Sequence, residues 1–209
     1  MELALFTVVV LIFSVIVHEV AHGYAALMLG DQTAKRAGRL TLNPLPHIDL
    51  FGSILIPALL VFTNAGFMFG FAKPVPYNPY NLRNQRFGEA IVASAGVLTN
   101  LTLAVLFALI ARTAALHGFS EFAQLAAVVT LVNLSLGLFN LIPIPPIDGY
   151  TVLRGVLPYK ASAYLQRFEE RMRAGGILTL VIVLFLITQF LSAPFGALVQ
   201  FCYQFLIGG

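Results

Sequence analysis

One short motif near the start of the chain has the residue types and spacing for metal chemistry: His18-Glu19-Val20-Ala21-His22. On an α-helix, residues i and i+4 share one face, so both imidazoles can reach the same ion. Neutral imidazole is a common Zn²⁺ ligand, and Glu19 lies beside the metal as a potential general base. The motif therefore predicts one zinc ion per chain, with His18 and His22 among its ligands.

The motif lies inside an apolar stretch, Glu2–Leu29, that is long enough to cross a bilayer. Ionisable groups are costly inside a membrane and generally have a function there. Besides a zinc site, two explanations of these groups stay open. They could form a polar patch that faces other helices, or they could belong to a transport pathway lined by histidines and acids.

A catalytic zinc site usually has three protein ligands and one open position. The longer zincin motif with a third histidine is absent, because Met28 stands at the matching position. The candidates for the third ligand are His47, Asp49, Glu89 and Asp148. Asp148 follows three prolines in the segment Asn140–Gly149, and these would break a helix and turn the chain back into the bundle. His47 could touch the metal or line the entrance, or it could only form hydrogen bonds within its loop.

Composition indicates that most of the protein faces lipid. Of the 209 residues, 59% are hydrophobic and 10% are charged, whereas a soluble domain has about 25% charged residues. A disordered chain and an ordinary soluble domain are therefore excluded. The net charge of +3 does not indicate nucleic-acid binding, because the basic residues lie between apolar runs and not along one polar face.

The apolar runs predict an all-α polytopic membrane protein with about five transmembrane helices. The expected spans are Glu2–Leu29, Phe87–Ala111, Phe122–Leu141, Ile177–Leu191 and Phe195–Ile207, the last two separated by Pro194. The residues Thr33–Leu42 suggest a small β-hairpin near the cytosolic face. Phe51–Phe71 is apolar but interrupted by helix breakers, which favours a re-entrant segment. A charged helix is expected at Tyr159–Arg173.

The distribution of basic residues predicts the orientation in the membrane. Eleven of the twelve fall in three loops, and they share one side if Phe51–Phe71 dips in and returns: Lys35, Arg36, Arg39, Lys73, Arg83, Arg86, Arg154, Lys160, Arg167, Arg171 and Arg173. That side is expected to be cytosolic, with the N-terminus and Arg112 outside. The His18–His22 motif would lie roughly 10–16 Å from the cytosolic end of its helix, at 1.5 Å per residue. The site is therefore expected to be submerged in the cell membrane but nearer the cytosol.

Two motifs in this order resemble the site-2 protease family of intramembrane zinc metalloproteases. The first is His18-Glu19-x-x-His22, and the second is Asn140-x-x-Pro143-x-Pro145-x-x-Asp148-Gly149. The resemblance implies that His18, His22 and Asp148 bind zinc and that Glu19 is the catalytic base. It also places Asn140 near the site. A third family pattern, Ala-Gly-Pro-x-x-Asn, ends here at Asn100 and has Val97 in place of the proline.

The resemblance spans roughly residues 3–157, and the chain is expected to form one membrane domain, residues 1–209, without the PDZ or CBS domain of many relatives. It implies hydrolysis of peptide bonds in or near transmembrane helices of other proteins. An exposed strand, Arg39–Leu42 or Phe69–Val75, could hold an unwound substrate by strand addition. A catalytically silent membrane-protein binder of the same fold and a metal or ion transporter are the alternatives. The sequence gives no oligomeric state.

Overall fold

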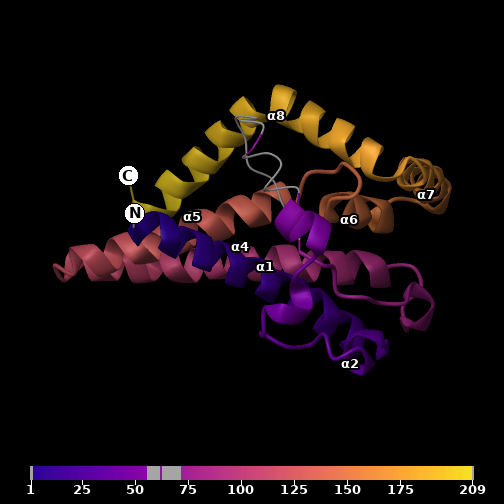
Figure 1. The fold of residues 1–209 in the computed structure, drawn as a ribbon, viewed down its shortest axis with the longest axis horizontal. Helices are drawn as coiled ribbons and strands as arrows, with labels where there is room; N and C mark the ends of the chain where they lie inside the picture. Colours follow the sequence, from indigo (N-terminus) through magenta and orange to yellow (C-terminus); the bar gives the residue numbers. More distant parts are fainter. Residues whose placement is uncertain (1, 56–61, 63–71, 209) are drawn as a thin grey trace.

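The computed structural model describes residues 2–55, 62 and 72–208 (Figure 1). The predicted all-helical class is confirmed, and no described residue lies in a β-strand. The α-helices are α1 Glu2–Met28, α2 Thr33–Arg36, α4 Gly88–Leu116, α5 Ser120–Phe139, α6 Asp148–Val156, α7 Tyr159–Ala174 and α8 Gly176–Ile207. Leu45–His47 and Pro79–Asn81 form short 3₁₀-helices, and Leu50–Leu55 forms a π-helical turn.

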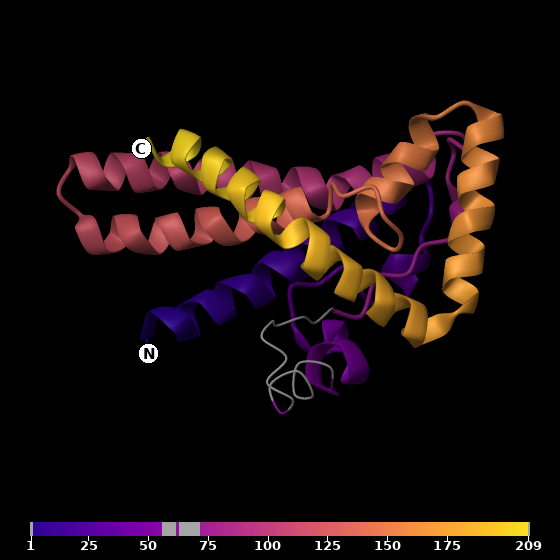
Figure 2. The same cartoon turned by 90° about the horizontal axis from the view of Figure 1, so that it is seen from above.

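Four of these helices are long and apolar enough to cross a membrane: α1, α4, α5 and residues Val181–Ile207 of α8. They run in alternating directions, so that both chain termini lie at the same end as the α4–α5 turn (Figures 1 and 2). The connection from α1 to α4 therefore starts and finishes at the opposite end, where α2, α6 and α7 also lie. This end carries the loops that flank the candidate site.

Helix α4 is the centre of the bundle, and it packs against α1, α5, α6 and α8. Its buried face consists largely of small residues: Gly88, Ala90, Ala93, Gly96, Ala104, Ala108, Ala111 and Ala114. Small side chains let helix backbones approach closely, which is how helices associate in lipid. A Cβ atom on Gly155 of α6 would come within 2.4 Å of the Ala90 Cβ, so α6 packs directly on α4.

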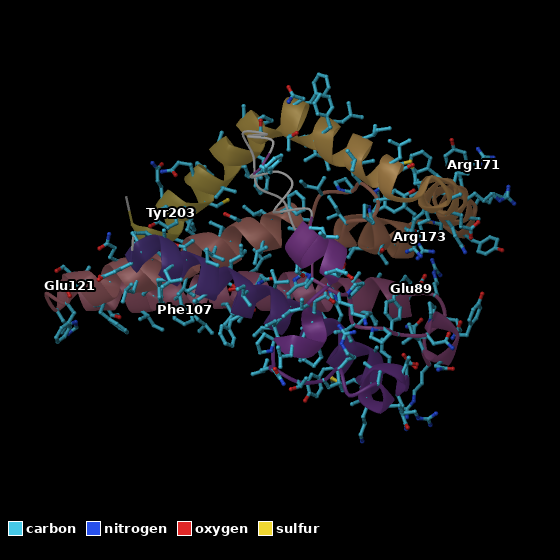
Figure 3. All side chains as sticks on the ribbon, viewed as in Figure 1. Glu89, Phe107, Glu121, Arg171, Arg173 and Tyr203 are labelled. Atoms are coloured by element: carbon cyan, nitrogen blue, oxygen red, sulfur yellow. The ribbon has the colours of Figure 1, made fainter. Side chains whose placement is uncertain are left out.

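The outer surface of the bundle is apolar. Large side chains such as Leu5, Phe13, Phe201 and Phe205 are exposed on α1 and α8, and extended apolar surfaces of this kind mark contact with a membrane or another protein. Charged side chains concentrate toward the loop-bearing end, where Glu89, Arg171 and Arg173 lie (Figure 3). The arrangement agrees with a multi-pass membrane protein.

The prediction of two short C-terminal spans was wrong, because residues 176–207 form the single helix α8 with Pro194 in its interior. The candidate spans therefore number four, not about five, among the described residues. A proline inside a helix removes one backbone hydrogen bond and bends the axis. Ending the helix in lipid would leave several backbone groups without partners, which costs more. Helix α8 accordingly continues as an arch over the bundle (Figure 1).

The predicted β-hairpin at Thr33–Leu42 was also wrong. Asp31 accepts hydrogen bonds from the backbone N–H and the hydroxyl of Thr33, at 3.2 and 2.6 Å, and the helical turn α2 begins there. The turn ends at Arg36 with Ala37 as its C-cap, and the next residue, Gly38, has a φ of +65°, which suits glycine. Most of the predicted re-entrant segment Phe51–Phe71 lies outside the described residues, so that prediction stays untested.

Asp31 also connects the end of α1 to the chain that leads into α4. Besides Thr33, its carboxylate accepts from the Asn78 backbone N–H at 2.8 Å and from the Asn81 amide at 2.9 Å. Burial alone would raise the pKa of this carboxyl, but the hydrogen bonds from Thr33, Asn81 and Asn78 outweigh burial and lower the pKa below its ordinary value. The charged carboxylate of Asp31 therefore connects the start of α2 to the segment around Asn78–Asn81 through hydrogen bonds.

Candidate metal centre

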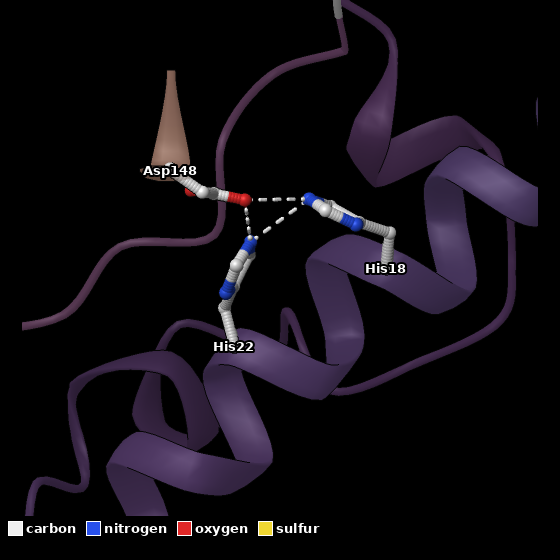
Figure 4. A group of neighbouring side chains, drawn as sticks. All are labelled: His18, His22 and Asp148. Atoms are coloured by element: carbon white, nitrogen blue, oxygen red, sulfur yellow. Dashed lines mark hydrogen bonds and ion pairs between the residues drawn. The ribbon is translucent and has the colours of Figure 1, made fainter. Parts of the chain in front are cut away.

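Three side chains from opposite parts of the sequence converge at one point (Figure 4). The Nε2 atoms of His18 and His22 lie 3.0 Å apart. The Oδ2 atom of Asp148 lies 3.0 Å from the first and 3.2 Å from the second. Both histidines are buried and Asp148 is half-buried, so three potential ligand atoms share a small, largely enclosed space.

The Nδ1 atom of each imidazole, which faces away from the centre, has its own hydrogen-bond partner. His18 Nδ1 lies 2.6 Å from Asn100 Oδ1, and His22 Nδ1 lies 2.7 Å from the Val92 carbonyl oxygen. Oxygen atoms of this kind accept, so each Nδ1 carries the proton and donates it. In a neutral imidazole, Nε2 then keeps a lone pair, and both Nε2 atoms point at the centre. Metal-binding histidines are normally oriented by such a bond from the second ring nitrogen.

The donor set fits Zn²⁺. Two ligand atoms at 2.0–2.1 Å from a tetrahedral zinc lie about 3.3 Å apart, close to the three separations seen here. Asp148 Oδ2 is buried and has no hydrogen-bond partner among the described residues, and the two Nε2 atoms that face it present lone pairs when the imidazoles are neutral. Three converging acceptors repel one another unless a cation lies between them. Two imidazoles and one carboxylate also match a catalytic zinc site that keeps a position open.

Asp148 reaches the histidines because the chain turns sharply after α5. The Gly149 backbone N–H donates to the Asn140 carbonyl at 2.7 Å and closes the bend. A Cβ atom on Gly149 would lie 2.3 Å from the Leu141 carbonyl oxygen, so only glycine fits. Asp148 is then the first residue of α6, where a negative charge is favoured by the helix dipole. The proline-rich segment was predicted to make this bend.

Helix α8 covers the bend from outside. Ile142 and Ile147 form a buried apolar cluster with Val183 and Ile187 of α8. Phe139, Phe195 and other partly buried residues pack around it. The long C-terminal helix therefore presses the segment that carries Asp148 against the rest of the bundle.

Gly96 on α4 lets the helix pass beside the histidine pair. A Cβ atom at this position would come within 2.6 Å of His22 Cε1 and Nε2 and within 2.7 Å of His18 Cε1. Sequence reasoning did not single out Gly96 as a site residue, although it stands in the Ala-Gly-Val-Leu-Thr-Asn segment that matches a family pattern. That match was the available signal.

Glu19, the predicted base, is half-buried and has one backbone partner. Its Oε2 atom accepts a hydrogen bond from the Val75 N–H at 2.9 Å. Val75 stands between Pro74 and Pro76, neither of which has an N–H. The Lys73 carbonyl accepts from Arg39 at 2.7 Å, and the Lys73 N–H donates to His47 at 2.8 Å. The segment Lys73–Val75 is thus held at Lys73 by two hydrogen bonds and at Val75 by its bond to Glu19.

The other three candidates for the third ligand lie elsewhere. His47 is buried, and its Nε2 lies 2.9 Å from the Thr41 carbonyl, so it bonds within its own loop. Asp49 Oδ1 accepts from the Gly52 N–H at 2.7 Å. Glu89 pairs with Arg154 at 2.6 Å, and Arg154 also approaches Glu169 at 3.7 Å, which links α4, α6 and α7. Of the four, only Asp148 joins the histidines.

The two asparagines that the resemblance pointed to have different surroundings. Asn100 is fully buried and contacts His18 directly, as described above. The Asn140 amide donates to the Leu136 carbonyl of its own helix at 3.0 Å, and its backbone holds the bend. A third asparagine, Asn133, was not predicted: it is 1% exposed and lies 2.9 Å from Asn100. Its position in an apolar span, where an amide is costly, was the signal.

The fold and this group of side chains define a polytopic helical membrane protein with a His₂Asp centre suited to zinc. Residues 110–186 match the family model described as Peptidase family M50. The chain is 40% identical over 174 residues to a Bacillus subtilis (strain 168) protein named "Putative zinc metalloprotease YwhC", covering 79% of this chain and 75% of that one.

Two further relatives carry similar names. The chain is 29% identical to "Putative zinc metalloprotease Rip2" of Mycolicibacterium smegmatis, over 93% of this chain and 71% of the relative. It is 25% identical to "Zinc metalloprotease MJ0392" of Methanocaldococcus jannaschii, over 85% of this chain and 41% of the relative. No solved structure matches. The chain belongs to peptidase family M50, the site-2 protease family of zinc metalloproteases.

Proposed function

We propose that this protein is an intramembrane endopeptidase that cleaves other membrane proteins in or near their transmembrane helices. The single observation that carries the proposal is the convergence of His18, His22 and Asp148, with Glu19 adjacent, inside a bundle of apolar helices. In this proposal the three side chains hold one zinc ion, and residues 1–209 act as one membrane domain.

When bound, zinc activates water and polarises the scissile carbonyl. Glu19 accepts a proton from the attacking water as its oxygen bonds to the carbonyl carbon. Glu19 then gives that proton to the leaving nitrogen as the C–N bond breaks. The Val75 N–H binds one carboxylate oxygen of Glu19 and so orients the other. Asn100 and the Val92 carbonyl keep both imidazoles turned toward the metal.

The substrate is proposed to be a transmembrane helix that unwinds locally before cleavage, because in lipid all its peptide groups are paired internally. Docking by strand addition has little support from the described residues. Neither Arg39–Leu42 nor Ala72–Val75 is a strand, and the N–H groups of Lys73 and Val75 already have partners. Residues 63–71 lie outside the described part of the chain.

Metal removal tests the proposed function. The purified protein in lipid nanodiscs should cleave a transmembrane test substrate, and a strong chelator should abolish cleavage because Glu19 then has no activated water. One equivalent of Zn²⁺ should restore it. Cleavage that survives complete removal of zinc would contradict the proposal. A protein that binds zinc and substrate but never cleaves would identify the catalytically silent binder, and zinc-dependent ion flux without cleavage would identify the transporter.

The proposed location is the cell membrane, with the metal centre submerged and nearer the cytosol. The only native cysteine is Cys202, so a Cys202→Ser background permits single-site labelling. Lys73→Cys, in the connection from α1 to α4, should react with an impermeant thiol reagent only from the cytosolic side, because ten other basic residues are expected to share that side. Arg112→Cys is the matched control and should react only from outside. Labelling of Lys73→Cys from outside would overturn the orientation.

A further inference from the structure

A chain of buried polar groups links three helices to the metal centre. Asn133 on α5 contacts Asn100 on α4, and Asn100 contacts His18 on α1. Asn133 also contacts Ser14, which lies one turn before His18. All four residues are buried. Buried polar groups in an apolar bundle are costly unless every one is bonded, so each donor in this chain is expected to face an acceptor.

The direction can be worked out from backbone carbonyls, which only accept. Asn133 lies 3.0 Å from the Val129 carbonyl, so the amide atom facing it must be nitrogen, and this nitrogen also donates to Ser14 Oγ at 3.0 Å. The remaining atom of Asn133 is its oxygen, which faces Asn100 at 2.9 Å. Asn100 must therefore present its nitrogen to Asn133.

The same reasoning fixes the next link. The Asn100 nitrogen also lies 3.4 Å from the Ser14 carbonyl, which agrees with a donor there. The Asn100 oxygen is then the atom that faces His18 Nδ1 at 2.6 Å. An oxygen at that position requires a proton on Nδ1, and in the neutral imidazole this leaves the lone pair of His18 on Nε2.

We propose that Asn133 is a positioning residue that sets the orientation of the Asn100 amide and thereby selects the His18 tautomer able to bind the metal. Without the oxygen of Asn133, the nitrogen of Asn100 keeps only its long contact to the Ser14 carbonyl. The Asn100 amide can then rotate and present its nitrogen to His18, which would move the proton to Nε2 and block the ligand atom. His22 does not depend on this chain, because its Nδ1 donates to the Val92 backbone.

This inference rests on the proposed role of His18 as a zinc ligand, so the test reads the tautomer first in metal-free protein. Nitrogen NMR of ¹⁵N-histidine-labelled protein distinguishes Nδ1–H from Nε2–H. With four histidines in the chain, His18 and His22 can be assigned by single substitution. Asn133→Leu should convert His18 from one tautomer to a mixture and leave His22 unchanged.

Zinc affinity, measured by competition with a chromogenic chelator, gives the second readout. Asn133→Leu should weaken binding by about tenfold, the lower end of the range for groups that orient a metal ligand. Asn133→Asp, with its buried carboxyl protonated, can donate to the Val129 carbonyl and keep its other oxygen toward Asn100, and it should restore binding to within about threefold of the parent. Thr130→Val is the matched control: Thr130 is also buried on α5, but its hydroxyl donates to Ala126 of the same helix, so neither readout should change.

Asn133→Ala repeats the test without added bulk if the leucine variant does not fold. An unchanged His18 tautomer in a folded Asn133→Leu or Asn133→Ala protein would overturn the inference. Equal loss of zinc affinity in Asn133→Leu and Asn133→Asp would also overturn it, because packing and not the oxygen would then be responsible. A parent protein that binds no zinc but shows the tautomer change would reject the proposed function and leave the inference about Asn133 standing.

Discussion

Glu19→Gln should bind zinc as the parent does and lose cleavage by about 10²–10⁴-fold, the usual contribution of a general base. Glutamine has nearly the same shape as glutamate, and its amide oxygen can still accept the Val75 N–H. The helix, the metal ligands and the segment around Val75 should therefore stay in place. What is lost is the carboxylate that takes the proton from water. Zinc content and cleavage of a transmembrane test substrate are measured on the same preparation.

The matched control is Gln32→Glu, a change between the same two residue types at an exposed position just before α2. It should leave both zinc content and cleavage unchanged. Cleavage by Glu19→Gln at the parent's rate would rule out Glu19 as the base and would direct attention to another acid. Loss of zinc together with cleavage would instead show that Glu19 mainly supports the metal.

Gly96→Ala should lower zinc affinity by roughly 10–100-fold, the range seen when the groups around a metal ligand are disturbed. The added methyl group would lie 2.6 Å from ring atoms of His22, closer than two such atoms can approach. Either the imidazoles rotate away from Asp148, or α4 moves outward and loses the Asn100 contact to His18. Both changes separate the ligand atoms. Competition with a chelator measures the change in affinity.

Gly196→Ala in α8 is the control for Gly96→Ala. A Cβ atom on Gly196 meets no atom of the described residues within 4 Å, the adjacent backbone of its own helix apart, and both glycines lie inside helices, where alanine is favoured by about 1 kcal/mol. The control should therefore bind zinc normally and be at least as stable as the parent. If Gly96→Ala also bound zinc with the parent's affinity, the close approach of α4 to the histidine pair would have no functional role.

Much of the site could be predicted because its residues are costly where they stand. His18, Glu19 and His22 form a motif with a helical period, and an Asp at membrane depth needs a counter-charge. The structure brings Asp148 to the two histidines. The residues that sequence reasoning missed contribute by packing or by relayed contacts. Gly96 matters because it has no side chain to collide with the two histidines. Asn133 acts through Asn100, which contacts His18. Neither role can be read without the three-dimensional neighbours.

The prediction of the fold was correct where the length of an apolar run decides the structure. It was wrong where a short local signal, such as a single proline, was given too much weight. Helices α1, α4 and α5 follow from long, mostly apolar runs that contain no proline. Pro194 suggested a boundary between two spans. In lipid, however, a bent helix is less costly than a helix that ends and leaves backbone groups without hydrogen bonds. The segment Thr33–Leu42 suggested a hairpin, but the Asp31 carboxylate binds Thr33 and the helical turn Thr33–Arg36 forms instead. In both places the structure depends on something outside the local sequence pattern: the surrounding lipid for α8, and the Asp31 side chain for the turn.

The ligands of the metal centre come from α1 and α6, and the two spans α4 and α5 lie between them in sequence. A metal held by both would act as a cross-link that closes a long loop, and long loops lose much entropy when closed. Binding free energy would then also be folding free energy, with stability rising with the concentration of free zinc. The bonds from zinc to its ligands would serve catalysis and would also hold the α5–α6 bend against α1. Protein depleted of zinc would therefore lose structure as well as activity.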